Sequence, residues 1–117
     1  ELGDLSSLTH LRLHRNELEG AIPAALGDLD TLRFMWLHGN LLRGSIPEEL
    51  GNLEKLERLW LSENQLTGQI PEVLGEMSNL IQWRFADNDF SGCLPAGLAE
   101  VQDTDFDSLG LQVCTDS

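Results

Sequence analysis

Three histidines are the residues of this chain whose side chains are best suited to catalysis or metal binding at neutral pH. His10, His14 and His38 are separated so that the last two share one position of the repeat described below. A metal would need a third ligand beside this pair. The next residue at that position is Ser62, which is a poor ligand, so we expect no metal site.

The sequence also shows no known arrangement of catalytic residues. No Ser-His-Asp, Cys-His or paired-carboxylate arrangement converges on the face that carries the histidines. Acidic residues are sparse there, and the cysteines, Cys93 and Cys114, lie near the C-terminus. We therefore expect a protein that is not an enzyme and that needs no cofactor.

Composition narrows the class of partner. The chain has 117 residues, which is room for one domain, and 41% of them are hydrophobic, as in a folded protein. Its formal net charge of -13 would repel a phosphate backbone, so we expect no nucleic-acid partner. No apolar run approaches the roughly 20 residues that span a bilayer.

A period of 24 residues organises the chain without insertions or deletions. It divides residues 1–97 into four repeats, 2–25, 26–49, 50–73 and 74–97, and leaves residues 98–117 as a C-terminal capping segment. Residues 8, 11 and 13 of the first repeat are apolar, and so are the residues at the equivalent positions of the other three repeats. The column members are Leu8, Leu11, Leu13, Leu32, Met35, Leu37, Leu56, Leu59, Leu61, Leu80, Trp83 and Phe85.

The alternation of apolar and polar residues around positions 11 to 13 predicts a short half-buried strand in each repeat. Strands that recur once per coil can stack only as a parallel sheet. An Asn column follows the strands, and its amides can bond backbone groups that turn inward. Gly and Pro columns then favour extended or 3₁₀ backbone on the outer side. The members of these columns are Asn16, Asn40, Asn64, Asn88, Gly20, Gly44, Gly68, Gly92, Pro23, Pro47, Pro71 and Pro95.

The repeated block LxxLxLxxNxLxGxIPxxLGxLxx resembles the plant-type leucine-rich repeat of receptor-like kinases, receptor-like proteins and polygalacturonase-inhibiting proteins. The resemblance covers residues 2–97. It implies an α/β-type repeat solenoid, a right-handed superhelix with a concave parallel sheet and an extended or 3₁₀ convex side. The paired-Cys amino-terminal cap and the close Cys pair of the C-terminal cap in that family are missing here.

The two ends of the array differ. The chain begins directly in a repeat, so Leu2, Leu5 and Leu8 would face water or a missing coil. We expect a fragment of a longer array, with self-association through this uncapped end as the alternative. In residues 98–117 the apolar columns decay and acidic residues appear without any basic one, which is typical of a solenoid terminus.

Cys93 and Cys114 are 21 residues apart, which is close to one turn of the repeat. Residues one turn apart lie at a distance that suits a disulfide, so we predict a bond between them. Such a bond would indicate an oxidising compartment. The alternative is two free, buried thiols in an intracellular protein.

The strand positions that point away from the core carry the candidate binding residues. Trp and Arg are enriched at interface hot spots, and exposed aromatic patches mark contact sites. The candidates are Arg12, Trp36, Trp60, Arg84, Phe34, Arg58, His14 and His38. Alternatively, the tryptophans and arginines could stack on one another as a cross-strand ladder without a ligand.

Charge also separates this strip from the rest of the chain. Five of the seven basic residues lie in or beside the strands, namely Arg12, Arg15, Arg33, Arg58 and Arg84, against three acids, Glu57, Glu63 and Asp87. A basic strip favours a carboxylate- or sulfate-bearing partner.

We therefore expect a recognition module that binds a protein, a peptide or an anionic glycan through its concave face. The family resemblance implies an extracellular or cell-surface location within a larger receptor or defence-type protein. The alternative is a cytoplasmic scaffold segment of a multidomain signalling protein.

Overall fold

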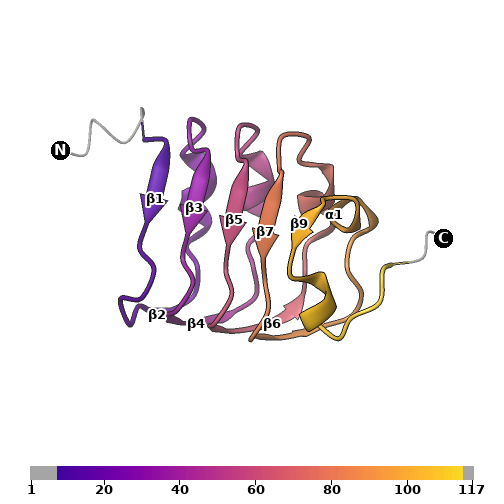
Figure 1. Cartoon of the computed structure of the whole chain (residues 1–117). Coiled ribbons are helices and arrows are strands. Elements are labelled where there is room, and N and C mark those ends of the chain that lie inside the picture. The colour runs from indigo at the N-terminus through magenta and orange to yellow at the C-terminus, as the bar shows by residue number, and fades with distance from the viewer. Residues whose placement is uncertain (1–7, 115–117) are drawn as a thin grey trace.

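The computed structural model describes residues 8–114 of the chain. Within this range the backbone forms a solenoid in which the strands of successive coils lie side by side (Figure 1). The larger parallel sheet contains, in this order, β1 (His10–Arg12), β3 (Phe34–Trp36), β5 (Arg58–Trp60), β7 (Gln82–Arg84) and β9 (Asp103–Thr104). Its register pairs His10 with Phe34 and Phe34 with Arg58, so neighbouring strands keep the step of the repeat. The predicted parallel-sheet solenoid is confirmed.

A second parallel sheet, which the sequence analysis did not predict, runs along the lower side of the solenoid in Figure 1. It contains β2 (Glu19–Gly20), β4 (Leu41–Gly44), β6 (Gln65–Gln69) and β8 (Asp89–Ser91). The glycines of the Gly column bend the chain here, with φ from +80° to +85°. Because this left-handed region is costly for residues with a Cβ, the glycine column sets where each coil turns.

The third side of each coil is short helical backbone, as predicted. Three 3₁₀ helices occupy equivalent positions, η2 (Ala24–Asp28), η3 (Glu48–Asn52) and η4 (Glu72–Glu76), and the fourth coil has one α-helical turn, α1 (Ala96–Ala99). A proline precedes each of them with extended φ and ψ. A Cβ on Gly27 would collide with the backbone of Glu49, so the small residue lets neighbouring coils approach closely.

The core lies between the two sheets and the helical side. Leu37, Leu61 and Phe85 are buried, as their column predicts. Leu13 belongs to the same column but is 39% exposed, which corrects the expectation of a core position. No coil among the described residues covers it on its outer side. Leu2 and Leu5, which were expected at this end, lie outside the described residues.

The Asn column forms a ladder inside the coils. The side-chain amide of Asn64 donates to the carbonyls of Leu37 and Leu61 at 3.0 and 3.1 Å, and its oxygen accepts from the amide of Leu42 at 3.0 Å. Asn40 and Asn88 make equivalent bonds. The backbone groups that leave the sheet are thereby satisfied.

The last coil is closed by the segment after α1. The carboxylate of Asp105 accepts hydrogen bonds from the amides of Phe85 and Ala86 at 2.9 and 2.8 Å, so it replaces the next strand of the ladder. Apolar residues of this segment also pack against the core, among them Val101 and Phe106, which begins the 3₁₀ helix η5 (Phe106–Ser108). The division of the chain into four repeats and a capping segment at residue 98 stays a prediction, and Asp116 lies outside the described residues.

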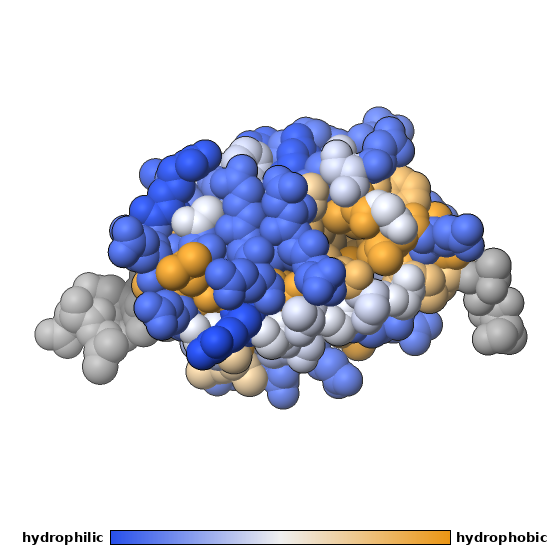
Figure 2. All heavy atoms as spheres, turned by 90° about the horizontal axis from the view of Figure 1, so that it is seen from below, coloured by the Kyte–Doolittle hydropathy of each residue, from blue (hydrophilic) through white to orange (hydrophobic). Residues whose placement is uncertain are grey.

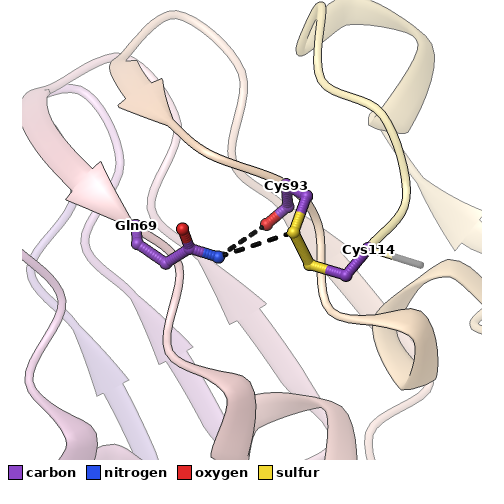
Figure 3. The surroundings of a disulfide bond; sticks show 3 residues. All are labelled: Gln69, Cys93 and Cys114. Atoms are coloured by element: carbon purple, nitrogen blue, oxygen red, sulfur yellow. Dashed lines mark hydrogen bonds between the residues drawn. A yellow bond between two sulfur atoms is a disulfide. The ribbon is translucent and has the colours of Figure 1, made fainter. Parts of the chain in front are cut away.

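A disulfide joins Cys93 to Cys114, the pair that the spacing predicts, with the Cα atoms 4.9 Å apart (Figure 3). The backbone on both sides is paired, since the amide of Leu94 donates to Gln112 and its carbonyl accepts from Cys114, each at 2.8 Å. The side chain of Gln69 in β6 donates to the carbonyl of Cys93 at 3.1 Å. Within residues 8–114, no helix has the length and apolar character to cross a bilayer.

Candidate functional site

The outward-pointing side chains of β1, β3, β5, β7 and β9, with the second residue after each of β1 and β3, form a surface that we call the strand face. All eight residues that the sequence singles out lie on it, and the parallel register brings them into one connected set of rings and guanidinium groups. Whether they bind a partner stays a prediction.

Two tryptophans form the centre of the strand face. The rings of Trp36 and Trp60 stack with centroids 5.4 Å apart and an interplanar angle of 30°. The guanidinium carbon of Arg12 lies 5.3 Å from the Trp36 ring, and that of Arg84 lies 5.6 Å from the Trp60 ring. The cross-strand ladder that the sequence left as an alternative is therefore present, and cation–π attraction stabilises it.

Phe34 and Arg58 extend the ladder toward the start of the strands. The Arg58 guanidinium lies 4.9 Å from the Phe34 ring, and His10 meets the same ring edge-on at 4.3 Å. Phe34 also stacks toward Trp36 at 6.2 Å. These rings are half-buried, so each keeps part of its surface exposed to solvent.

His14 and His38 form a stacked pair directly after the strands. Their rings are 4.9 Å apart and nearly parallel, with an interplanar angle of 7°. His14 lies edge-on to Trp36, and His38 lies against Trp60. His38 is only 8% exposed, and this burial lowers its pKa, with further lowering by His14 and Arg15 and an opposing effect of Glu63.

In the C-terminal half of the strand face, the polar side chains are hydrogen-bonded to one another. The indole N–H of Trp60 donates to Gln82 Oε1 at 2.6 Å, and Gln82 Nε2 donates to Asp103 Oδ2 at 2.6 Å. Arg84 completes the ring through an ion pair of 2.7 Å with Asp103. Hydrogen bonds from Gln82 and Arg84 lower the pKa of the Asp103 carboxyl. We call these four residues the closed half.

Sequence reasoning missed Gln82 and Asp103 as parts of this surface. Gln82 occupies the same column as Phe34 and Arg58, so its position was visible, but its role depends on Asp103. Asp103 lies 21 residues after Gln82, out of step with the repeat, because the chain shortens its path in the last coil. A periodic pattern carries no signal for such a residue.

The N-terminal half lacks comparable bonds. Among the described residues, four buried side-chain nitrogens have no hydrogen-bond partner, and all lie in this half: His14 Nδ1, Trp36 Nε1, His38 Nδ1 and Arg58 Nε. Leaving a buried polar group unpaired costs about 1–3 kcal/mol. We call Arg12, His14, Trp36, His38 and Arg58 the open half.

Ion pairs follow the same division. Arg33 is paired with Glu57 at 2.7 Å beside the strands, and Arg84 is paired with Asp103. Within residues 8–114, Arg12, Arg15 and Arg58 take part in no salt bridge. The positive charge of the strand face is therefore uncompensated at the open half.

Metal binding finds no support in this arrangement. Within the described part of the chain, no group of three or more His, Cys, Asp or Glu side chains is placed to hold a metal ion. The lone pairs of a neutral imidazole lie in the ring plane, so two parallel stacked rings do not direct them at one point.

The side of the second sheet is different in character. Figure 2 shows it as hydrophilic over most of the N-terminal half, with a hydrophobic area toward the C-terminal end. It carries no comparable set of stacked rings, arginines and unpaired donors among the described residues. The strand face is therefore the candidate site.

The Leucine Rich Repeat family model matches residues 7–29, 31–53 and 55–77 of the chain. No curated protein matches it significantly.

Several solved structures are similar. The ectodomain of the Arabidopsis thaliana receptor kinase GASSHO1/SCHENGEN3, in complex with CASPARIAN STRIP INTEGRITY FACTOR 2, is 39% identical with a TM-score of 0.80, over 88% of this chain and 12% of that one. The A. thaliana BIR2 ectodomain is 32% identical with a TM-score of 0.84, over 96% and 61% of the two chains.

The Arabidopsis receptor kinase HAESA, in complex with the peptide hormone IDA and the co-receptor SERK1, is 34% identical with a TM-score of 0.76, over 92% of this chain and 18% of that one. The chain thus spans 12% to 61% of the length of these three structures.

Proposed function

The chain belongs to the plant-type leucine-rich repeat family, and from that premise we propose that it is a non-enzymatic recognition module whose strand face binds an extended protein or peptide segment. The observation that carries the proposal is the ladder of Trp36, Trp60 and their flanking arginines on the outward side of the larger sheet. Rigid aromatic rings with polar neighbours are the residue types that dominate binding energy at interfaces.

A protein or peptide is the partner class that the comparisons favour. HAESA is described with a peptide hormone and a co-receptor, both of which are proteins or peptides. The arginine side chains on the strand face would also attract an anionic glycan, which stays the second candidate partner. Self-association through the first coil is a further proposal, supported by the exposed Leu13.

We place the protein outside the cell or at its surface, within a larger receptor or defence-type protein. The disulfide between Cys93 and Cys114 supports an oxidising compartment, and the similar structures include receptor ectodomains. A cytoplasmic scaffold is the alternative, and the redox state of the two cysteines in the native protein would distinguish between them.

The test is capture of partners from native extracellular and cytosolic extracts by the wild type and by the double variant Trp36→Ala, Trp60→Ala. We expect the variant to fold and to lose the captured partner, because the two side chains point away from the core. A matched control is Leu41→Ala with Arg43→Ala, two exposed residues of β4 on the second sheet, which should retain the partner.

Equal capture by the wild type and the tryptophan variant would exclude the strand face as the binding surface. Unfolding of the variant, detected by circular dichroism, would show instead that the tryptophans stabilise the fold. In that case the milder Trp36→Phe variant, which keeps an aromatic ring, is the informative comparison.

A further inference from the structure

The unpaired atoms of the open half specify what kind of group they would bind. An indole N–H and an arginine Nε–H are donors only, so Trp36 Nε1 and Arg58 Nε can be satisfied only by an acceptor. A neutral imidazole carries one donor and one acceptor, whereas an imidazolium donates from both nitrogens. The open half therefore lacks an acceptor, and this need increases if a histidine is protonated.

The free protein favours the neutral form of the His38 ring. Burial lowers the pKa of His38, and the neighbouring His14 and Arg15 lower it further, while Glu63 alone acts in the opposite direction. Two parallel rings 4.9 Å apart would also repel each other if both were charged. An anion placed beside His38 would act in the direction of Glu63 and favour the protonated ring.

We propose that His14, His38 and Trp36 form a docking subsite for a carboxylate of the partner, an Asp or Glu side chain on an extended acidic peptide. This rests on the proposed function of the strand face and adds the chemistry of one of its subsites. The carboxylate accepts from the Trp36 indole N–H and from one imidazolium. The proton that creates the imidazolium comes from solvent when the peptide binds.

His14 is the side chain that must move to admit the carboxylate. It belongs to the first described coil, it is half-exposed, and its ring lies over His38 and edge-on to Trp36. Turning this ring outward would remove its cover from the His38 and Trp36 rings, each of which carries an unpaired buried nitrogen. The ring nitrogens of His14 then remain free to take part in the bond to the carboxylate.

Local charge favours an acidic peptide despite the net charge of -13. Arg12, Arg15 and Arg58 lie around the subsite without ion pairs among the described residues. At physiological ionic strength charges more than about 8 Å away are largely screened, so the local charge is set by these arginines and by Glu63, the carboxylate that acts on His38, and not by the net charge of the chain. Charge-assisted hydrogen bonds to a carboxylate are about twice as strong as neutral ones.

The test uses nuclear magnetic resonance of the full chain with a blocked peptide, acetyl-Gly-Glu-Gly-Glu-Gly-amide. The indole N–H signals report the three tryptophans separately. We expect the peptide to shift the Trp36 indole and the ring signals of His14 and His38. The Trp83 indole, which is buried and donates to the carbonyl of Leu98 at 3.0 Å, should stay in place. The same peptide with Gln in place of Glu should cause no shift.

Affinity should depend on pH, because the bound state carries one proton more than the free protein. The peptide carboxylates stay ionised at pH 6 and at pH 8, so the dependence reports the protein. We expect the dissociation constant to rise about tenfold or more between these two pH values. An unchanged constant would overturn the proton-coupled subsite.

Variants locate the response. His14→Phe with His38→Phe keeps two stackable rings and removes the nitrogens, and it should weaken the Glu peptide at least about tenfold. The control is the double change Leu41→Ala, Arg43→Ala on the second sheet, because both residues are exposed and lie outside the strand face, and it should bind as the wild type does. If the double variant fails to fold, the single change His14→Phe at the half-exposed ring gives the same comparison.

The outcomes separate this inference from the proposed function. Equal shifts with the Glu and Gln peptides would keep the strand face as a contact surface and overturn the carboxylate subsite. A second result would also overturn only the carboxylate subsite: neither peptide causes a shift, but the tryptophan double variant still loses a partner that the wild type captures. If every variant still responds to the Glu peptide and still captures the partner as the wild type does, both the subsite and the proposed function of the strand face are overturned.

Discussion

At the scale of single residues, the burial of His38 links the stability of the free protein to pH. Its ring is 8% exposed, and its pKa lies below the ordinary value of 6.5 because burial disfavours the charged form. The unfolded chain therefore binds more protons than the folded one between the lowered pKa and 6.5. The free energy of unfolding should fall as the pH decreases through this window.

The change His38→Phe should remove that part of the pH dependence. We expect the difference in urea midpoint between about pH 7.5 and pH 5.5 to be smaller in the variant than in the wild type. His10→Phe, which lies on the same face but outside the buried pair, serves as the control and should keep the wild-type difference. An identical difference in the wild type and in His38→Phe would show that another group causes the effect.

The residues of the site were more predictable than their partners. Arg12, Trp36, Trp60 and Arg84 could be assigned to one outward column because parallel strands in a fixed period must align them. Their pairing with Gln82 and Asp103 could not, because hydrogen bonds depend on rotamers and on the shortened last coil. The unequal halves of the strand face therefore emerge only in the structure.

At the scale of elements, the sequence predicts a strand or helix when the residues that determine it lie within that element or next to it. The strands of the larger sheet follow from alternation within a few residues, and the 3₁₀ helices follow from the proline before each of them. The second sheet depends on how closely neighbouring coils stack, since β2 and β4 have no alternation that identifies them alone. β9 was not predicted either, because Thr104 stands where the repeat would place a leucine.

The disulfide ties the closing segment to the fourth coil, and its removal should act mainly there. The double change Cys93→Ser, Cys114→Ser frees a loop with a sequence separation of 21 residues. For a loop of this size the expected loss of stability is about 3 kcal/mol. Urea unfolding measures the total, and hydrogen exchange shows where it acts.

The amide of Leu94, which donates to Gln112 across this segment, should exchange faster in the cysteine variant. The internal control is the amide of Leu37 in the second coil, which donates to the carbonyl of Trp60 in the third coil. Its exchange rate should change much less. Equal acceleration of both amides would mean that the four coils unfold together, and that the disulfide stabilises the array as one unit.

At the scale of the whole molecule, the solenoid is stabilised by contacts between neighbouring coils, so its ends should contribute less than its centre. Leu61 and Leu13 occupy the same column, which makes them a matched pair. Leu61 is fully buried between two coils, whereas Leu13 is 39% exposed at the first described coil. A hollow of about 200 Å³ at this end is lined by Leu13, Leu18, Ile22 and neighbouring apolar residues.

The change Leu61→Ala should therefore cost about 3 kcal/mol or more, as expected for a buried leucine, and Leu13→Ala should cost less than about 1.5 kcal/mol. Urea unfolding of both variants measures the two losses at one protein concentration. Equal losses would mean that Leu13 is covered in solution, because an exposed side chain has little burial to lose. Sedimentation of the wild type would then decide what covers it, since a second copy raises the apparent mass and makes the midpoint depend on protein concentration, whereas cover from within the same chain changes neither.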